Sequence, residues 1–560
     1  MLKKNLKRWT SLLAAGTMVV TSLAGCSSSK EAETTAAATT AAANTSNTTV
    51  ETTAAAAAAP AEPAFADYSN GFPSQVTIQI PVFDRAFEGW NVTDNYYTDW
   101  VQKEFGDKYN VKVEYVAISR SSQVNDYMQL LASGKAPDII FHYDMPQMLA
   151  YYGEESMQPL NLDEIAYYAP TYWANMSETI KTYGAVEGQN YFVFAARPEQ
   201  YNEVALIRQD WLDAVNMDMP TSLEELNAVL AAWKEAGLGH GGGRLIMNSY
   251  TFDYPYRSTD MTKEENALYS DLAVAAFPSQ QVHDYLKNLN YQYNNGLIDT
   301  EFYLNTDDAS TQADFIAGNA GVMVNYYISS GTTIIDNLLV NNPDAKIAYL
   351  PKEALTPEGN TPNSRAFWPF GMIMGINQDC TDEERAAVWM YLDWLSDADN
   401  LFYFQNGIEG QNYTLDADGL AVKIDGYEGE SKLSQNNNKD YWCLITESAT
   451  YATEELTHKA NLKNWAPAGY EYLIEDAYAD FKATAEYRKP DALFTVVISS
   501  LAEYKAELGE RWKELYVKCA MAPEAEFEAV YEECCQDFLD SGYQEILDEK
   551  QAAIDAGAFN

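Results

Sequence analysis

Basic residues and histidines are scarce in this chain. Its 560 residues include 36 Lys and Arg against 82 Asp and Glu, a formal net charge of -46, and only four histidines. A field of this sign repels nucleic-acid phosphates and anionic lipid headgroups, so we predict no nucleic-acid partner and no peripheral binding to lipid. The histidines are far apart, and neither H-E-x-x-H nor G-x-S-x-G occurs. We therefore predict a protein that is not an enzyme and has no catalytic residue.

Signatures of bound metals and cofactors are also missing. There is no EF-hand loop of alternating Asp or Asn ligands with a glycine and a closing Glu, and the cysteine spacing matches no zinc module. The run Gly237–Gly242 satisfies G-x-G-x-x-G, but it follows a helical pattern and precedes a strand-like one, which is the wrong order for a dinucleotide loop. We predict no metal and no cofactor.

Cysteine is rare, and its number after residue 26 is odd. The five cysteines are Cys380, Cys443, Cys519, Cys534 and Cys535. An odd number cannot all pair, and the adjacent Cys534 and Cys535 lie on a helical pattern that points them to different faces. We interpret the five as mostly buried thiols, with one disulfide possible whose partners the sequence cannot assign.

Long apolar runs are absent except at the N-terminus. A basic start is followed there by an apolar stretch, Trp9–Gly25, which is short for a membrane span. The stretch ends in Leu-Ala-Gly-Cys at Cys26, and the whole resembles a bacterial lipoprotein signal. The resemblance implies that residues 1–25 are removed as a signal peptide and that the Cys26 thiol carries a diacylglycerol. We therefore predict an anchor on the outer face of the cytoplasmic membrane, with membrane contact through the lipid alone.

Residues 26–64 lack the side chains needed to build a core. They are almost entirely Ser, Thr, Ala, Glu and Asn, with Pro60 and Pro63 near the end, a composition typical of disordered segments. A flexible coil of this length spans roughly 30 to 35 Å. We predict a lipidated tether over residues 26–64 and a folded body over residues 65–560, which is long enough for two or more cores.

Strand-like and helix-like patterns alternate in the body. Val76–Val82, Val111–Ala117 and Ala136–Phe141 have the pattern of strands with amphipathic helices between them, and a second region of this kind follows Val204–Arg208. Such alternation predicts an α/β fold with a mostly parallel sheet and ligands beyond the carboxyl ends of its strands. From about Phe494 the pattern is helical.

Four segments together resemble the signature of one protein family. They are Ser133–Ile139 (SGKAPDI), Arg208–Leu212 with Pro220–Leu226 (RQDWL and PTSLEEL), Phe315–Gly321 (FIAGNAG) and Asn406–Gly410 (NGIEG) followed by Tyr413 and Asp416–Gly419. Their order and spacing are similar to those of extracellular solute-binding proteins of carbohydrate ABC transporters, in the large lipoprotein branch that binds aldouronates or other oligosaccharides. The chain departs from this pattern at Phe192–Pro198.

The resemblance implies a two-lobe, periplasmic-binding-protein-like fold of type II, with mixed sheets, flanking helices and a helical C-terminal segment. The first lobe is expected over about residues 70–200 plus a return segment, the second over about 205–420, and the C-terminal helices over about 490–560. The resemblance also implies a monomer that captures an oligosaccharide by closing its lobes and delivers it to the permease subunits of an ABC importer.

Aromatic residues make up 13% of the chain, which suits a sugar site. Pyranose rings present C–H faces that pack on aromatic rings, while their hydroxyls bind carboxylates, amides and guanidinium groups. We select candidate ligand-binding residues after strand ends and in loops such as the proline-flanked segment before Gly371. The candidates are Asp84, Arg85, Trp90, Tyr143, Asp144, Arg197, Tyr326, Phe367, Trp368 and Glu409. Trp368 fits two roles, a platform for ligand or an indole in the core.

Two other functions stay open at this point. A peptide-binding or sensory lipoprotein would also use an aromatic site between two lobes. A polysaccharide-degrading enzyme on the cell surface is the alternative from another class, but among 82 acidic residues no catalytic carboxylate pair can be chosen. The charge of the ligand is open too: uronates would need Arg85 and Arg197, whereas neutral sugars would not.

Overall fold

The computed structural model describes residues 65–560, except 199–202, 240–255, 257–260, 270–273, 305–307, 328–330, 363–364, 425, 427–437, 450, 452, 466 and 491. The expected signal peptide, the lipidation site at Cys26 and the tether lie outside the described residues. Within the described ranges, no helix combines the length and the apolar character needed to cross a membrane.

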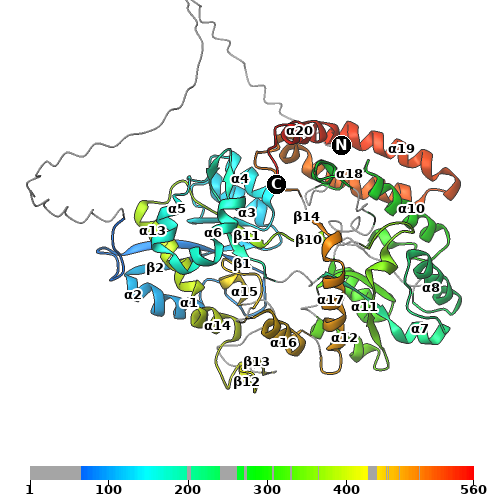
Figure 1. Ribbon diagram of the computed structural model, residues 1–560, viewed down its shortest axis with the longest axis horizontal. Coiled ribbons are helices and arrows are strands. Elements are labelled where there is room, and N and C mark those ends of the chain that lie inside the picture. Colours follow the sequence, from blue (N-terminus) through cyan, green and yellow to red (C-terminus); the bar gives the residue numbers. More distant parts are fainter. Residues whose placement is uncertain are drawn as a thin grey trace, which may run out of the picture. The chain divides into compact units, whose positions relative to one another are not determined.

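The first lobe, at the left of Figure 1, contains three small sheets among the described residues. Its strands are β1 (Val76–Asp84), β2 (Val111–Ser119), β3 (Ile139–His142), β4 (Ala185–Val186), β5 (Gln189–Asn190), β6 (Val193–Ala196) and β11 (Phe370–Ile376). β1 pairs with β2 in parallel, whereas β11 lies between β3 and β6 and is antiparallel to both. β3 runs beside β1, because the backbone N–H of Asp138 donates to the carbonyl of Gln79.

Helices pack around the β1–β2 and β3–β11–β6 sheets of the first lobe. They are α1 (Tyr96–Val101), the π-helical turn η1 (Gln102–Gly106), α2 (Asp107–Tyr109), α3 (Gln123–Ala132), α4 (Met145–Gly153), α5 (Leu162–Tyr168), α6 (Pro170–Tyr183), α13 (Asp382–Ser396), α14 (Ala398–Asn406) and α15 (Lys439–Trp442). Helix α4 packs against β3 and β11, and α6 packs against β6. The sequences IIFH in β3 and FGMIMGI in β11 are buried along their whole length, as expected for strands covered on both sides.

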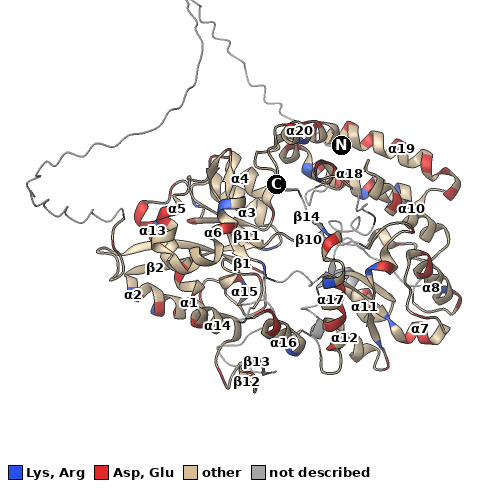
Figure 2. Cartoon of the chain, viewed as in Figure 1, with Lys and Arg blue, Asp and Glu red and all other residues tan. Residues whose placement is uncertain are grey.

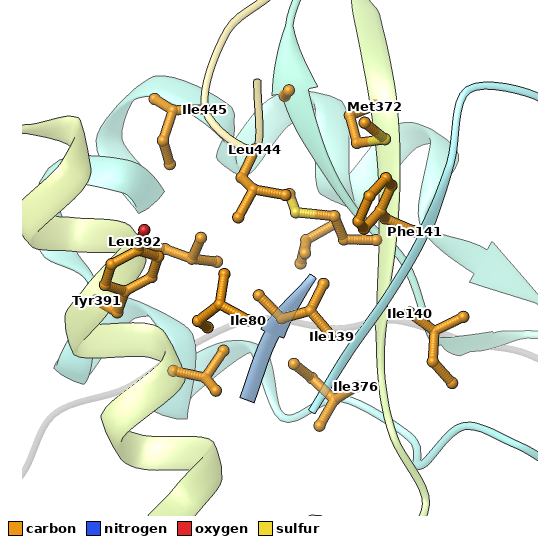
Figure 3. Close-up of a cluster of buried hydrophobic side chains, with 14 of the residues drawn as sticks. Ile80, Ile139, Ile140, Phe141, Met372, Ile376, Tyr391, Leu392, Leu444 and Ile445 are labelled. Carbon is orange, nitrogen blue, oxygen red and sulfur yellow. The ribbon is translucent and has the colours of Figure 1, made fainter. Parts of the chain in front are cut away.

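Residues far downstream return into the core of this first lobe. Figure 3 shows Tyr391 and Leu392 of α13 and Leu444 after α15 packed with Ile80 of β1 and Ile139 of β3. Apolar side chains within residues 370–404 and 441–445 are buried in the first core against β1, β3 and β6. We propose that these stretches are the return segment expected for the first lobe.

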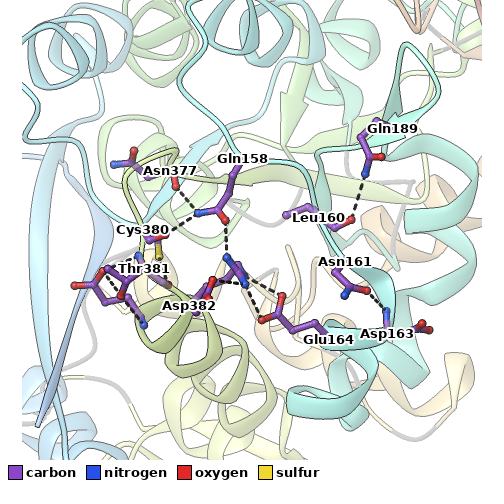
Figure 4. A network of polar contacts seen from close by, with 12 residues as sticks. Gln158, Leu160, Asn161, Asp163, Glu164, Gln189, Asn377, Cys380, Thr381 and Asp382 are labelled. Atoms are coloured by element: carbon purple, nitrogen blue, oxygen red, sulfur yellow. Dashed lines mark hydrogen bonds and ion pairs between the residues drawn. The ribbon is translucent and has the colours of Figure 1, made fainter. Parts of the chain in front are cut away.

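A polar network fastens this return segment to the first lobe (Figure 4). The guanidinium of Arg385 on α13 donates to both carboxylate oxygens of Glu164 on α5, at 2.9 and 3.0 Å, and to Gln158 Oε1 at 2.6 Å. Gln158 in turn donates to the carbonyls of Asn377 and Cys380. Thr381 and Glu384 form a capping box at the start of α13.

The second lobe is built on the antiparallel sheet β8–β7–β9. Its elements are β7 (Glu203–Arg208), α7 (Gln209–Val215), α8 (Leu223–Glu235), α9 (Lys263–Tyr269), α10 (Gln280–Asn294), the 3-10 helices η3 (Phe302–Leu304) and η5 (Lys352–Leu355), α11 (Asp308–Ala317), β8 (Val322–Tyr327), α12 (Gly331–Asn341), β9 (Ile347–Tyr349), α16 (Glu454–Asn464) and α17 (Tyr472–Ala483). Successive side chains of β7 enter different cores. Ala205 and Ile207 pack toward α8 and α10, and Val204 and Leu206 pack toward α12 and α17.

The C-terminal helices form the outer layer of the core beside α8 and α10. They are α18 (Ser499–Met521), the 3-10 helix η7 (Glu524–Glu526), α19 (Phe527–Phe538), the π-helical turn η8 (Leu539–Tyr543) and α20 (Gln544–Asp555). Acidic residues are spread over these and other helices, α8 and α13 among them (Figure 2). Lys505 of α18 reaches Asp144 at the start of α4, at 3.5 Å, so α18 also contacts the first lobe.

Five further short elements lie among the described residues of the body. β10 (Arg365–Ala366) pairs in parallel with β14 (Lys489–Pro490), β12 (Tyr413–Leu415) forms a hairpin with β13 (Ala421–Lys423), and η6 (Ala485–Tyr487) precedes β14. The expected α/β class and two lobes are confirmed, but the expectation of a mostly parallel sheet is wrong. The strands β11, β8 and β9 each come from another part of the chain and enter against the direction of their neighbours.

Candidate functional site

The carboxyl ends of β1, β2, β3 and β6 meet the amino end of β11 at one edge of the first lobe. Asp84 at the end of β1 is paired with Ser119 at the end of β2, and Ala196 at the end of β6 is paired with Phe370 at the start of β11. Phe83 of β1 stacks on Tyr143, which follows β3. Side chains that follow these ends therefore gather in one place, which we call the strand edge.

Arg85 occupies the strand edge after β1 and forms a two-pronged ion pair. Its Nε and Nη2 donate to the two carboxylate oxygens of Asp440 on α15, at 2.8 and 2.9 Å. The Asp440 side chain is 4% exposed and that of Arg85 22%. Burial raises the pKa of Asp440 despite the bond from Arg85. Although burial alone would lower the pKa of Arg85, Asp440 raises it above its ordinary value, so Arg85 remains charged.

Arg197 forms the second ion pair of the strand edge, with Glu447. Its Nε donates to Glu447 Oε2 at 2.5 Å, and its guanidinium lies 4.7 Å from the ring centre of Phe367. The backbone N–H of Glu447 donates to the carbonyl of Ala196, which aligns the Glu447 segment with β6. A Cβ atom at Gly371 would overlap with the Glu447 carboxyl group, so a glycine here makes room for this carboxylate.

Arg120 follows β2 and lies over two aromatic rings. Its guanidinium carbon is 4.9 Å from the ring centre of Phe83 and 5.5 Å from that of Tyr143. Within the described part of the chain it has no carboxylate partner. Burial raises the pKa of Tyr143 far above its usual value, with Cys443, Glu447 and Asp440 acting in the same direction and Arg120 against it. Tyr143 thus lies within electrostatic reach of both ion pairs and of Arg120.

His142 ends β3 beside this cluster and is held as a neutral ring. The backbone N–H of Asp144 donates to His142 Nδ1 at 3.0 Å, so the ring proton is on Nε2. Burial lowers the pKa of His142 to about 3, and Lys505 and Arg120 contribute. The buried Nε2–H has no acceptor among the described residues. Such an unpaired donor costs about 1–3 kcal/mol unless water or a ligand accepts from it.

Three other predicted residues make contacts within the first lobe. The Asp84 carboxylate accepts from the backbone of Ala86, and Trp90 packs edge-on against Tyr97 in the first core. Trp368 packs against Tyr183 and Phe370 of the same core.

Two predicted residues belong to other elements. Glu409 is exposed in the loop before β12. Tyr326 is paired with Val204 through its backbone, and its side chain lies outside the described residues.

Sequence reasoning missed three members of the strand edge. Arg120 directly follows a predicted strand, so the rule that selected Arg85 could have selected it. Asp440 and Glu447 lie after the undescribed residues 427–437, in a segment without strand or helix periodicity, and no sequence signal connects them with β1 or β6.

One group of side chains has the composition of a metal site. Ligand atoms of Asp138, Cys380 and Glu384 lie within 4.8 Å of one another. Asp138 Oδ2 accepts from the backbone of Gln79, however, and Glu384 Oε2 accepts from both the backbone and the hydroxyl of Thr381. These carboxylates support β1 and the start of α13, at the opposite end of β3 from the strand edge.

Comparison with known proteins agrees with this architecture. The family model described as bacterial extracellular solute-binding protein matches residues 100–409, more than half of the chain. The chain belongs to this family. A curated relative, lipoprotein LipO of Bacillus subtilis (strain 168), is 24% identical over 438 residues, which cover 71% of this chain and 82% of LipO. The family predicted from the four motifs is thereby confirmed.

Solved structures of similar fold include an alginate-binding protein and a substrate-binding protein of an ABC transporter. The alginate-binding protein AlgQ2, solved without calcium ion, has a TM-score of 0.59 and 18% identity, covering 87% of this chain and all of its own. FusA, an ABC-transporter substrate-binding protein of S. pneumoniae in complex with kestose, has a TM-score of 0.57 and 14% identity, covering 86% and 99%. At such identities the similarity shows the fold, which is the two-lobe solute-binding fold.

Proposed function

We propose that this protein captures an oligosaccharide at the strand edge and delivers it to an ABC importer while anchored through lipid on Cys26. The single observation that carries the proposal is the composition of the edge: three guanidinium groups and two carboxylates alternate with the rings of Phe83, Tyr143 and Phe367. Sugars need planar groups for their hydroxyls and aromatic faces for their C–H surfaces. The similar fold of an alginate-binding protein and of a substrate-binding protein in complex with kestose is consistent with this assignment.

The charge balance of the edge favours a neutral glycan over a polyuronate. Arg85 and Arg197, the two candidates for binding uronates, are each paired with a carboxylate. Among the three arginines of the strand edge, Arg120 is the one without a carboxylate partner in the described chain. We assign it the role of a hydrogen-bond donor to ring or hydroxyl oxygens, held in place by Phe83 and Tyr143.

The binding proposal is tested by a thermal-shift screen of residues 65–560 against neutral and acidic glycans, amino acids and peptides. A ligand at 100 times its dissociation constant should stabilise the body by about 2.7 kcal/mol. Neutral oligosaccharides should raise the melting temperature most. A shift with peptides and none with any glycan would replace the proposal by a peptide receptor, and release of shorter glycans on incubation would replace it by an enzyme.

A matched pair of variants locates the ligand. Arg120→Gln should weaken binding of the glycan at least tenfold, because Gln keeps hydrogen-bonding capacity but loses the planar cation over Tyr143. Lys108→Gln is the control, since Lys108 lies 4.7 Å over the ring of Tyr109 in the same lobe but away from the strand edge. Equal affinity of Arg120→Gln and the parent would exclude this edge as the binding site.

The anchor is tested separately. Cys26→Ser should move the full chain from the membrane fraction to the medium, and metabolic labelling with a fatty acid should mark the parent alone. A Cys26→Ser chain that stays with the membrane would refute lipidation without affecting the sugar proposal.

A further inference from the structure

Two cysteines of the C-terminal helices lie in contact inside the second lobe. Cys519 is on α18 and Cys534 on α19, both are free thiols buried in the same core, and each is the group that most strongly shifts the pKa of the other. The two helices pack against each other and are joined by the short segment 522–526. Sequence alone left the pairing of the five cysteines open, whereas the fold brings these two together.

Helix periodicity explains why they meet. Leu508, Leu515 and Cys519 follow one another along the buried face of α18. Tyr531, Cys534 and Phe538 do so along α19. Spacings of three, four and seven residues place side chains on one helix face, so each cysteine belongs to the face through which its helix enters the core.

The remaining cysteines are placed elsewhere. Cys380 and Cys443 are buried in the first core, among the side chains of the other lobe. Cys535 is partly exposed on the neighbouring face of α19, where its side chain is hydrogen-bonded to Tyr531. One pair among the five is therefore favoured.

We propose that Cys519 and Cys534 form a disulfide that clamps α18 to α19 once the protein is outside the cell. The exterior is an oxidising environment, where disulfides persist. Because α18 also carries Lys505, which contacts Asp144 of the first lobe, the bond stiffens a helix that touches both lobes. The inference uses the extracellular assignment of the family and does not depend on the identity of the ligand.

The reaction balances with a disulfide as oxidant, supplied by an extracellular dithiol oxidoreductase or by oxidised glutathione in vitro. Cys534 is the first nucleophile, since the neighbouring thiol of Cys519 lowers its pKa against the effect of burial, with help from Lys518. Its thiolate attacks one sulfur of the oxidant and releases one thiol. Cys519 then loses its proton and attacks the mixed disulfide at Cys534, which releases the second thiol. Two protein S–H bonds become one S–S bond, and the oxidant gains two electrons and two protons.

The test compares residues 65–560, the body that forms one compact unit, refolded with oxidised or with reduced glutathione. After oxidation, proteolysis without reductant followed by mass spectrometry should yield the peptides of Cys519 and Cys534 joined and two hydrogens lighter. Thiol titration in denaturant should find three free thiols in place of the five after residue 26. Five free thiols, or a bond between any other two cysteines, would overturn the proposal.

Variants distinguish the effect of the Cys519–Cys534 disulfide from other effects of oxidation. Cys535→Ser keeps both partners and should cross-link like the parent, whereas Cys519→Ala should not. The oxidised parent should melt roughly 2 °C or more above the reduced parent, and this difference should vanish in Cys519→Ala. A cross-link without any rise would refute the clamping role. The mass measurement on the parent protein decides the pairing even if a variant fails to fold.

Discussion

The two ion pairs of the strand edge contain the same chemical groups but differ in their surroundings. In Arg85–Asp440 the carboxylate is 4% exposed and both of its oxygens are held by one guanidinium. In Arg197–Glu447 both side chains are 17% exposed, and the pair borders the Phe367 ring and the backbone of Gly371. The first pair connects α15 to the end of β1 through a carboxylate that is more buried than Glu447, although Arg85, at 22%, is slightly more exposed than Arg197. We propose that the first pair supports the fold and that the second borders the ligand.

Removal of the buried carboxylate should produce the largest effect. Asp440→Asn leaves the charge of Arg85 without a counter-ion, which should lower the free energy of unfolding by about 3 kcal/mol. The matched change Glu447→Gln should cost less, about 1 kcal/mol, because Glu447 is 17% exposed against 4% for Asp440, so water can partly replace this carboxylate as the partner of the arginine. Urea denaturation at pH 7 measures both. Equal losses in the two variants would remove the distinction between the pairs.

His142 should make the same edge sensitive to acid. Burial, then Lys505 and Arg120, lower its pKa to about 3, whereas a histidine in the unfolded chain titrates near 6.5. The folded state therefore binds this proton less well, so the stability it contributes is complete above about pH 6.5 and is lost as the pH falls toward 3. His142→Asn keeps an acceptor for the backbone of Asp144 and cannot titrate, so between pH 7 and pH 4 it should lose about 3 kcal/mol less stability than the parent.

Asp138 provides a control, because its titration should change stability with pH in the direction opposite to that of His142. Burial raises its pKa to about 6, so its folded state favours the proton, and the stability it contributes is present below about pH 4 and lost as the pH rises through 6. Asp138→Asn should therefore make the chain lose more stability on acidification than the parent. If His142→Asn and Asp138→Asn change the pH profile in the same direction, the assignment of either titration is wrong.

Local patterns in the sequence predicted the first strands of the first lobe, but they did not predict which strands pair with one another. The apolar run before His142 and the alternation around Val76 predicted β3 and β1 at nearly the observed bounds. The partners of these strands were not predictable, since β11 enters the sheet from more than 200 residues downstream and contact between distant segments leaves no periodic signal.

The candidate site was predictable to the extent that it follows strand ends. Arg85 and Tyr143 are where the rule places them, because each comes directly after a predicted strand of the first lobe, and Arg197, which was selected for its charge, directly follows β6. Their counter-charges, Asp440 and Glu447, are supplied by a segment that only the tertiary fold brings near. A basic residue found from sequence can therefore be assigned a position at the edge, but the charge available to a ligand depends on partners that the sequence does not reveal.

A substitution at Gly371 should disturb the Arg197–Glu447 pair without changing either of its residues. Gly371→Ala places a methyl group where the Glu447 carboxyl group lies, so the carboxylate must move away from Arg197. Glycan affinity should fall about tenfold, or about 1.4 kcal/mol, in a titration by calorimetry. Gly375→Ala on the same strand is the control, because its added methyl meets the flexible side chain of Met157 instead. A similar loss of affinity in both variants would point to a general distortion of β11.

The smallest expected change in glycan affinity distinguishes two adjacent aromatic residues. Phe367 lies under the Arg197 guanidinium, whereas Trp368 packs on Tyr183 and Phe370 in the first core. Phe367→Ala should lower glycan affinity several-fold, because a stacked ring contributes on the order of 1 kcal/mol, while the melting temperature of the ligand-free protein changes little. Trp368→Ala should do the reverse, with a loss of roughly 2 to 3 kcal/mol of unfolding free energy for a half-buried indole and a nearly unchanged dissociation constant. Affinity loss confined to Trp368→Ala would instead make this indole the platform for the ligand and would shift the site from the Arg197–Glu447 pair toward α6.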